Sequence, residues 1–374
     1  MLIISFDAVS DTVFKDKLLF YPNISSFAKT AEVRLGVETV FLSNTYPTHC
    51  SIATGLLPKD HGVISNTEPF PDPNPKWTTE ASLFKSKPLW QSASEAGLKV
   101  AAVLWPVTCG SPHIRYNIPE VHIQPGENQV RANLKAGSKL LQLDVLLRYK
   151  SLLKGEKQPE LDDFITSCAA YILKKKKPAL TFVHLICFDA FSHRHGPYSD
   201  ELEPAFESLD KNLGRLLQAA GDKPVMIVSD HACVSVHTCL NPNDMLYDMG
   251  LAEKCFFECC GGSAFFYPCG IPENVTIEVK EKVAGSVGFS RFLTESEMRD
   301  SGRTALPFGY GLMEGYMVDH LPCDHKGTHG YPTDMPDYRV FYAVRGDGFS
   351  PGKTSTGGSI LDINSIAKKM LRIG

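Results

Sequence analysis

The sequence lacks any apolar run of 18 residues or more, the length that a helix needs to cross a bilayer. Its first residues, Met1 to Asp7, also lack the basic start and the longer apolar stretch of a signal peptide. There is no excess of positive charge, since 38 Lys and Arg residues stand against 42 Asp and Glu residues, a formal net charge of -4. We therefore expect a cytoplasmic protein that binds neither membranes nor nucleic acid.

Paired cysteine spacing is also missing. The 11 cysteines are an odd number, and the densest cluster, from Cys255 to Cys269, has no paired C-x-x-C motif of a structural zinc site. Because no export signal is present either, we interpret the cysteines as free thiols in a reducing compartment.

What the sequence does have is a regular alternation of short apolar runs and longer helical patterns, which predicts an α/β fold. The clearest strands are Leu2–Phe6, Val100–Leu104, Leu180–Phe188, Val225–Val228 and Tyr338–Val344. Helical patterns lie at about Pro88–Ala96, Asn128–Leu153, Leu161–Leu173, Glu201–Ala219 and Ser359–Leu371. Nearly continuous apolar strands indicate a doubly wound, mostly parallel sheet with helices on both faces.

One stretch breaks this alternation. From about residue 233 to 321 the chain is rich in Cys, Gly and Phe and contains a short β-like run, Asn274–Val279. We interpret it as an insertion or cap within a single catalytic domain spanning residues 1–374. The Pro-rich segment Pro69–Lys76 is expected to form a surface loop.

Acidic residues follow three of the predicted strands: Asp7, Asp189 and Asp230. A single such aspartate is typical of a helix cap or a turn. Three of them would meet at the carboxyl edge of a parallel sheet, where ligands bind, and would repel one another unless cations were bound there.

Histidines complete this candidate metal site. His231 adjoins Asp230, His193 follows Asp189 by four positions, and His329 precedes the last predicted strand. Taken alone, His329 is more typical of a surface loop. Mixed carboxylate and imidazole ligands favour zinc over calcium or magnesium, with manganese or iron as alternatives.

A cluster of hydroxyl residues, Ser43 to Thr48, precedes a predicted helix that runs to Gly55. A hydroxyl at a helix N-terminus meets free backbone N–H groups and a dipole that favours phosphate, and a bound metal would lower its pKa. The same position is also typical of an N-cap. From the residues alone, Thr45 is not distinguished from Ser43, Thr48 or Ser51.

Together these motifs resemble the type I phosphodiesterase / nucleotide pyrophosphatase family of the alkaline phosphatase superfamily. The matching pieces occur in the family's order and span nearly the whole chain: Ile4–Asp7, Asn44–His49, Thr54–Gly62, Asp189 with His193 and Gly196-Pro197, Ser229–His231, and Thr328–Tyr331. The resemblance implies an alkaline phosphatase-like fold and a hydrolase of phosphodiester or pyrophosphate bonds that acts on a small phosphodiester or nucleotide.

The resemblance also implies residue roles. One divalent metal would be held by Asp7, Asp230 and His231 and would contact Thr45. A second would be held by Asp189, His193 and His329. Thr45 would attack phosphorus and form a phosphothreonine, which water then hydrolyses. Asn66 matches a donor to a phosphate oxygen, and Tyr46 matches an aromatic position that stacks on a nucleobase.

The sequence departs from the family at three small residues. Ala8, Ala232 and Ser65 stand where glycines are usual, which makes the nucleotide preference less certain than the chemistry. The alternative interpretations are an enzyme like phosphonoacetate hydrolase, which cleaves a carbon–phosphorus bond with similar residues, and a non-catalytic metal-binding relative. The sequence leaves the oligomeric state open.

Overall fold

The first strand of the chain lies in the middle of an eight-stranded sheet. The computed structural model describes residues 1–69, 75–155 and 157–374, and the strand order of this sheet is β15-β2-β14-β6-β1-β5-β3-β4. The strands are β1 (Leu2–Phe6), β2 (Glu32–Val37), β3 (Val100–Val103), β4 (Tyr116–Ile118), β5 (Leu180–Leu185), β6 (Val225–Val228), β14 (Val340–Arg345) and β15 (Thr354–Thr356). Strand β14 runs antiparallel to both its neighbours, and the other pairs are parallel, which confirms the mostly parallel sheet.

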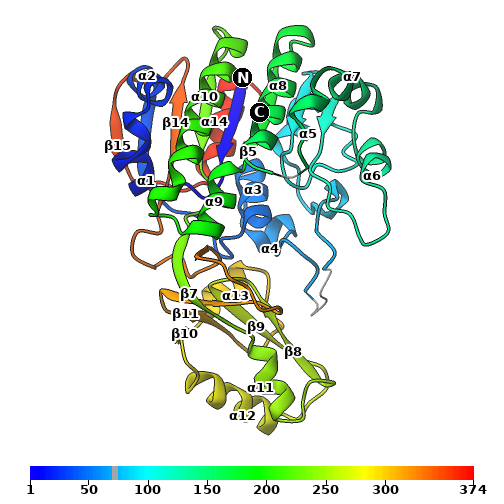
Figure 1. Cartoon of the computed structure of the whole chain (residues 1–374), viewed down its shortest axis with the longest axis vertical. Coiled ribbons are helices and arrows are strands. Elements are labelled where there is room, and N and C mark those ends of the chain that lie inside the picture. The colour runs from blue at the N-terminus through cyan, green and yellow to red at the C-terminus, as the bar shows by residue number, and fades with distance from the viewer. Residues whose placement is uncertain (70–74, 156) are drawn as a thin grey trace.

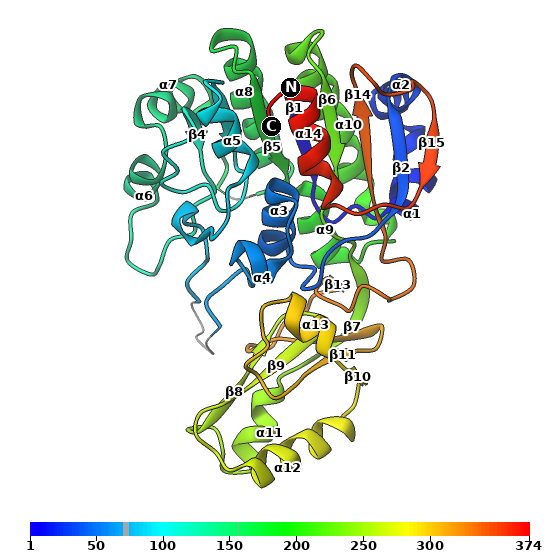
Figure 2. The same cartoon turned by 180° about the vertical axis from the view of Figure 1, so that it is seen from behind.

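Helices cover both faces of this sheet (Figures 1 and 2). Those whose buried residues pack on one face are α1 (Asp11–Asp16), α2 (Pro22–Thr30), α7 (Lys139–Tyr149), α8 (Glu160–Lys175) and α10 (Glu203–Ala220). On the other face lie α3 (Thr45–Thr54), α5 (Leu89–Glu95) and α14 (Asp362–Leu371). The predicted α/β architecture with two covered faces is therefore confirmed.

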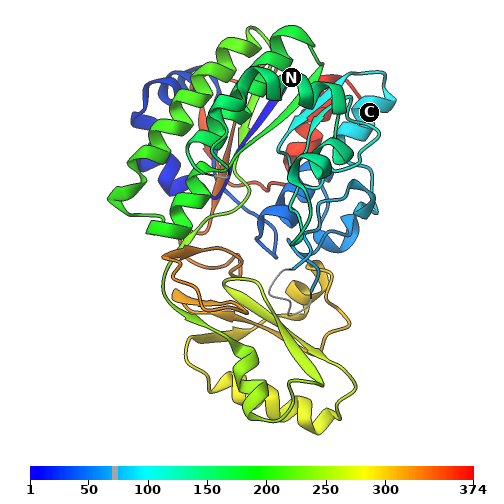
Figure 3. The same ribbon diagram turned by 45° about the vertical axis from the view of Figure 1, so that its right-hand side comes forward.

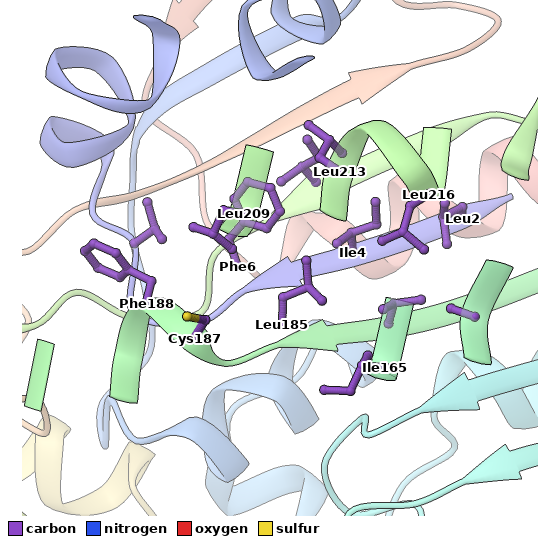
Figure 4. Close-up of a cluster of buried hydrophobic side chains, with 14 of the residues drawn as sticks. Leu2, Ile4, Phe6, Ile165, Leu185, Cys187, Phe188, Leu209, Leu213 and Leu216 are labelled. Atoms are coloured by element: carbon purple, nitrogen blue, oxygen red, sulfur yellow. The ribbon is translucent and has the colours of Figure 1, made fainter. Parts of the chain in front are cut away.

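Successive side chains of β1 point to opposite faces of the sheet, and both faces are covered, so apolar side chains lie on both sides of the strand. Leu2, Ile4 and Phe6 belong to the core beneath α8 and α10, as Figure 4 shows with Leu209, Leu213 and Leu216 of α10 around them. Ile3 points to the opposite core. Each such side chain, fully buried, contributes about 1.5–3 kcal/mol relative to exposure, so this strand is fixed from two sides.

The helical pattern predicted over Asn128–Leu153 is two helices, α6 (Gln129–Ala136) and α7, followed by a short 3-10 turn, η3 (Lys150–Leu152). Gly137 separates them. Its backbone is extended, and a side chain there would meet Pro119 at 2.5 Å. The helical pattern continues past this glycine, which is why the break was not predicted.

A smaller lobe lies below the sheet in Figure 1, and the turned view in Figure 3 shows the same arrangement. It contains a four-stranded sheet, β10-β11-β9-β8, and a three-stranded sheet, β12-β7-β13. Its elements are β7 (Val234–Leu240), α11 (Pro242–Asp248), β8 (Cys255–Cys259), β9 (Ser263–Pro268), α12 (Glu273–Ala284), β10 (Phe289–Phe292), α13 (Glu295–Asp300), β11 (Gly309–Leu312), β12 (Gly315–Val318) and β13 (Gly327–Thr328). The predicted insertion at about residues 233–321 corresponds to β7 through β12.

The β-like interpretation of Asn274–Val279 is wrong, because this run lies in helix α12. Its β-branched residues favour a strand by propensity. However, the residues that are buried on this helix are Val279 and Val283, whose spacing of four places them on one helical face. Of the Pro-rich segment Pro69–Lys76, residues 70–74 lie outside the described residues.

Candidate metal centre and nucleophile

The three predicted aspartates meet near the carboxyl ends of the central strands. Asp7 follows β1 directly, and Asp230 lies two positions after β6, which pairs with β1. The position of Asp189 differs from the prediction. Strand β5 ends at Leu185, and Asp189 lies in the first turn of helix α9 (Cys187–His195). All three approach one another because β5 and β6 flank β1 on its two sides.

A first group consists of Asp7, Asp230 and His231, whose ligand atoms all lie within 4.8 Å of one another. The Nε2 atom of His231 is 3.4 Å from Oδ1 of Asp7 and 3.2 Å from Oδ2 of Asp230. These are the three residues that the sequence predicted to hold one metal.

The second group differs from the predicted set. Asp189, His231 and His329 come within 4.8 Å of one another, whereas His193 is not part of this group. His193 lies beside it, with Nε2 at 3.3 Å from Oδ1 of Asp189 and its ring 5.2 Å from the ring of His329. His231 therefore stands between the two groups.

The histidine rings are oriented by their Nδ1 atoms. Nδ1 of His231 is 3.2 Å from the Ala232 carbonyl oxygen, and Nδ1 of His193 is 2.8 Å from that of Gly327. Since a carbonyl oxygen only accepts hydrogen bonds, each Nδ1 carries a proton, and in the neutral ring each Nε2 presents a lone pair. These lone pairs face carboxylate oxygens of Asp230 and Asp189, which are also acceptors.

Facing acceptors repel one another unless a metal ion, or a proton on the imidazole, lies between them. Two further atoms indicate the same, because Oδ1 of Asp7 and Oδ1 of Asp189 are buried and have no hydrogen-bond partner. Neutral imidazole nitrogens and carboxylate oxygens are the donor set of zinc and of similar divalent metals. The described residues thus fit one or more divalent cations.

Electrostatics support this arrangement. Burial, and then the charges of Asp230 and Asp189, raises the pKa of Asp7 well above its usual range. Burial, together with the nearby His231 and His193, lowers the pKa of His329 well below its usual range, so that this imidazole is neutral. A bound cation would relieve the repulsion on Asp7 and favour the neutral ring.

Two hydroxyl residues, Thr45 and Thr48, reach this centre, and Thr45 is the one that approaches His231. It is the first residue of α3, and its Oγ1 lies 3.2 Å from Nε2 of His231. Ser43 donates to the Tyr331 carbonyl, and Ser51 pairs with His61. Thr48 lies 3.2 Å from Oδ2 of Asp230, but its hydroxyl is closer to the Asn44 carbonyl, at 2.7 Å. Thr45 is therefore the hydroxyl of these four that approaches His231, the residue shared by both groups.

Asn66 and Tyr46 lie beside Thr45. Oδ1 of Asn66 accepts the backbone N–H of Tyr46 at 2.9 Å, which turns the amide NH2 of Asn66 away from that bond. The Tyr46 side chain is 1% exposed, and Trp77 lies against it with ring centroids 5.4 Å apart. The partly exposed aromatic surface next to the nucleophile is therefore formed by Trp77, which stacks on His122 at 3.9 Å.

Sequence reasoning gave no role to two buried histidines that support the carboxylates. Nε2 of His184, in β5, lies 2.8 Å from Oδ2 of Asp7, and Nδ1 of His49 lies 3.3 Å from Oδ2 of Asp230. A signal existed for each. His184 lies in a buried, mainly apolar strand, and His49 is one helical turn after Thr45.

The glycine replacement at position 8 has a structural consequence. Ala8 has φ 63°, in the left-handed region that favours glycine, and its N–H donates to Oδ1 of Asp230 at 3.2 Å. Ala232 is not among the described residues with positive φ. Of these two alanines, therefore, only Ala8 stands where replacement by glycine would remove backbone strain.

The cysteine-rich segment 255–269 supplies no ligand to either metal-binding group found among the described residues. Among all the residues that the structure describes, no helix combines the length and apolar character that crossing a bilayer requires.

Comparison with known proteins links this geometry to one family. The family described as Type I phosphodiesterase / nucleotide pyrophosphatase matches residues 1–285. Human ectonucleotide pyrophosphatase/phosphodiesterase family member 1 is 25% identical over 227 residues, which are 59% of this chain but only 20% of that protein. Human bis(5'-adenosyl)-triphosphatase ENPP4 is 22% identical, with 97% of this chain and 76% of that protein covered. The fold resembles murine ENPP5 in complex with AMP, with TM-score 0.75, 17% identity, and coverage of 100% and 95% of the two chains.

Proposed function

The chain belongs to the type I phosphodiesterase / nucleotide pyrophosphatase family, and on this premise we propose that it is a metal-dependent hydrolase of phosphodiester or pyrophosphate bonds, with Thr45 as nucleophile. The observation that carries the proposal is the 3.2 Å approach of Thr45 Oγ1 to His231 Nε2. This places the hydroxyl beside the residue that joins the two carboxylate–imidazole groups.

Two divalent metals, zinc being our proposal, would be held by Asp7, Asp230 and His231 and by Asp189, His329 and the adjacent His193. When bound, they supply charge that lowers the pKa of a hydroxyl and neutralises phosphate oxygens. The protein fixes the ligand atoms in advance, since His184 holds Asp7 and His49 holds Asp230.

The reaction on the protein's own atoms has two displacements. Oγ1 of Thr45 loses its proton and attacks phosphorus, and the leaving alcohol or phosphate takes a proton as its bond to phosphorus breaks. Water then attacks the phosphothreonine and restores the Thr45 hydroxyl. In this proposal, the N-terminus of α3 and the NH2 group of Asn66, whose Oδ1 accepts from the Tyr46 N–H, would provide partial positive charge for the phosphate.

The charge around Thr45 favours diesters over monoesters. A monoester carries nearly two negative charges at neutral pH, so enzymes that prefer it gain from additional cationic donors. Arg194, the neighbouring cation that could serve, is exposed on α9, and the Lys59 ammonium is paired with Asp60 at 2.8 Å. Asn66 supplies a neutral donor, which is adequate for the single charge of a diester.

Nucleotides are the substrate class that we propose. One relative is named as a bis(5'-adenosyl)-triphosphatase, and the similar ENPP5 structure holds AMP. In this chain the partly exposed Trp77 and His122 rings, stacked beside Tyr46, offer an aromatic surface near the nucleophile, on which a base can stack.

The test compares kcat/KM for a para-nitrophenyl nucleotide diester, para-nitrophenyl phosphate, a dinucleoside polyphosphate and phosphonoacetate, with zinc added and at one pH. We expect the nucleotide diester or the polyphosphate to be cleaved fastest, and a chelator to abolish turnover until zinc is restored. A clear preference for the monoester or for phosphonoacetate would overturn the substrate class. Full turnover by protein without bound metal would overturn the mechanism.

A further inference from the structure

Two cysteines far apart in sequence meet in the smaller lobe. Cys239 lies near the end of β7, and Cys323 lies in the loop of residues 319–326 between β12 and β13. Their Sγ atoms are 2.7 Å apart. This is shorter than the roughly 3.5–4.0 Å of ordinary non-bonded heavy-atom contacts, although both cysteines are free thiols.

A shared metal ion does not account for this distance. Thiolates bound to zinc at about 2.3 Å in a tetrahedron have their sulfur atoms nearly 4 Å apart. In addition, neither group of potential metal ligands among the described residues contains Cys239 or Cys323. A further sulfur, Sδ of Met317, lies 3.6 Å from the Cys323 Sγ. The spacing is instead suited to direct reaction between the two sulfurs.

Both thiols can be reached from solvent. Cys239 and Cys323 are partly exposed, whereas most other cysteines are buried. The Cys323 S–H donates to Cys239 Sγ. Burial and this hydrogen bond raise the pKa of Cys323 to about 12. Because Cys323 is the donor of the pair, we assign Cys239, the acceptor, as the attacking sulfur.

The pair lies at one end of a segment that leads to the metal centre. The 319–326 loop ends in β13, which pairs with β7 through Gly327 and Ser235. Where the loop meets β13, the Lys326 N–H donates to the His193 carbonyl at 2.8 Å, and the Gly327 carbonyl accepts from Nδ1 of His193. A covalent link between β7 and the loop would therefore hold the segment that precedes His329.

We propose that Cys239 and Cys323 form a redox-reactive dithiol that hydroperoxides oxidise to a disulfide, which fixes the 319–326 loop to β7. The Cys239 thiolate attacks one peroxide oxygen, giving a sulfenic acid and releasing hydroxide or alkoxide. The Cys323 sulfur then displaces the sulfenic hydroxyl, which leaves as water, and the S–S bond forms. Overall, two thiols and one hydroperoxide give one disulfide, water, and a second water or an alcohol.

The test treats the full chain with a stoichiometric amount of hydrogen peroxide, blocks remaining thiols, and maps disulfides by mass spectrometry without reduction. We expect one linked peptide pair containing Cys239 and Cys323, a mass lower by two hydrogen atoms, and reversal by dithiothreitol. The oxidised protein should melt about 5 °C higher than the reduced protein, since the link closes a long loop.

Three variants separate this proposal from general oxidation. Cys239→Ser and Cys323→Ser should each lose the linked peptide and the melting shift, whereas Cys269→Ser, at an exposed cysteine outside the pair, should keep both. If either serine variant fails to fold, disulfide mapping of the oxidised, unmodified chain still tests whether Cys239 and Cys323 are linked. Absence of the Cys239–Cys323 peptide in folded, oxidised protein, or a link to another cysteine instead, would overturn the proposal.

Discussion

Oδ1 of Asn44 lies 2.9 Å from Nδ1 of His329, so the residue just before the proposed nucleophile orients a ring that is 285 positions further along the chain. Because the amide oxygen accepts, Nδ1 of His329 carries the proton and Nε2 is left to bind a metal. Asn44 also begins helix α3 as its N-cap residue. One residue thereby links the position of Thr45 to the second ligand group.

The first prediction follows from this contact. Asn44→Leu should weaken zinc binding about 10–100-fold, because removing such a supporting hydrogen bond frees the ligand ring. Asn44→Asp keeps an acceptor and should remain closer to the unmodified protein. Competition with a chromophoric chelator measures both affinities. Equal zinc affinity in Asn44→Leu and the unmodified protein would show that the contact does not orient His329 for metal binding.

The second prediction concerns the nucleophile. Thr45→Ala should reduce kcat by about 10³-fold or more while the fold and metal content persist, and Thr45→Ser should retain part of the activity. Thr54→Ala is the matched control, because Thr54 ends the same helix with similar burial, 8% against 9% exposed. Steady-state kinetics and metal analysis are needed for all three variants. If Thr45→Ala turns over normally, the nucleophile lies elsewhere.

The third prediction compares two alanine-to-glycine changes. Ala8→Gly should stabilise the protein by about 1 kcal/mol, since the left-handed backbone costs alanine about 1–2 kcal/mol and glycine loses some of that gain as chain entropy. Ala232→Gly should destabilise by about 1 kcal/mol, because it adds chain entropy without relieving the backbone. Urea denaturation with unchanged slopes gives both values. Shifts of the same sign at the two positions would refute the backbone argument.

The fourth prediction is a pH dependence. Asp162 is fully buried, and burial raises its pKa to about 7 even though the N–H groups of Ile186 and Cys187 donate to it at the start of α9. An unfolded aspartate has a pKa of about 3.9. Between these values the folded chain keeps a proton that the unfolded chain has released. This contribution to stability is therefore complete below about pH 4 and is lost as the pH rises to about 7.

Asp162→Asn should remove that dependence. Relative to the unmodified protein, the variant should gain stability as the pH rises from about 4 to 7, by up to roughly 4 kcal/mol. Urea denaturation across this range measures the difference, with Asp200→Asn at an exposed position as the control. A difference between Asp162→Asn and the unmodified protein that stays constant with pH would contradict the prediction.

Much of the fold was predictable because its signals are local. Each strand of the central sheet that was predicted is present, and helix α3 runs to Thr54, next to the predicted end at Gly55. The predictions failed where tertiary packing, rather than the local sequence, determines the secondary structure. Helix α12 forms despite its β-branched residues because Val279 and Val283 face the smaller lobe's core. Helix α6 ends at Gly137, where a Cβ would meet Pro119, and no sequence window of helical length contains both residues.

For the site, the sequence supplied the candidate ligand residues but not their grouping. His231 belongs to both groups and His193 lies beside them, because α9 begins two residues after β5 and carries Asp189 inward on its first turn. The direction in which α9 leaves β5 depends on how the helix packs against the rest of the protein. The supporting pairs, His184 with Asp7 and Asn44 with His329, join residues more than 170 positions apart, and spacing along the chain does not reveal them.

The position of β14 affects the order in which this protein is completed during synthesis. Strands β2 and β6 do not pair with each other, since β14, at residues 340–345, lies between them. A ribosome therefore synthesises residues 1–345 before β2 and β6 can be joined through β14. Until then, β2 and the open edge of β6 present unpaired backbone groups, the kind of surface that chaperones protect from aggregation. A prematurely terminated chain would retain Asp7, Asp230 and His231 yet leave its sheet in two separate pieces.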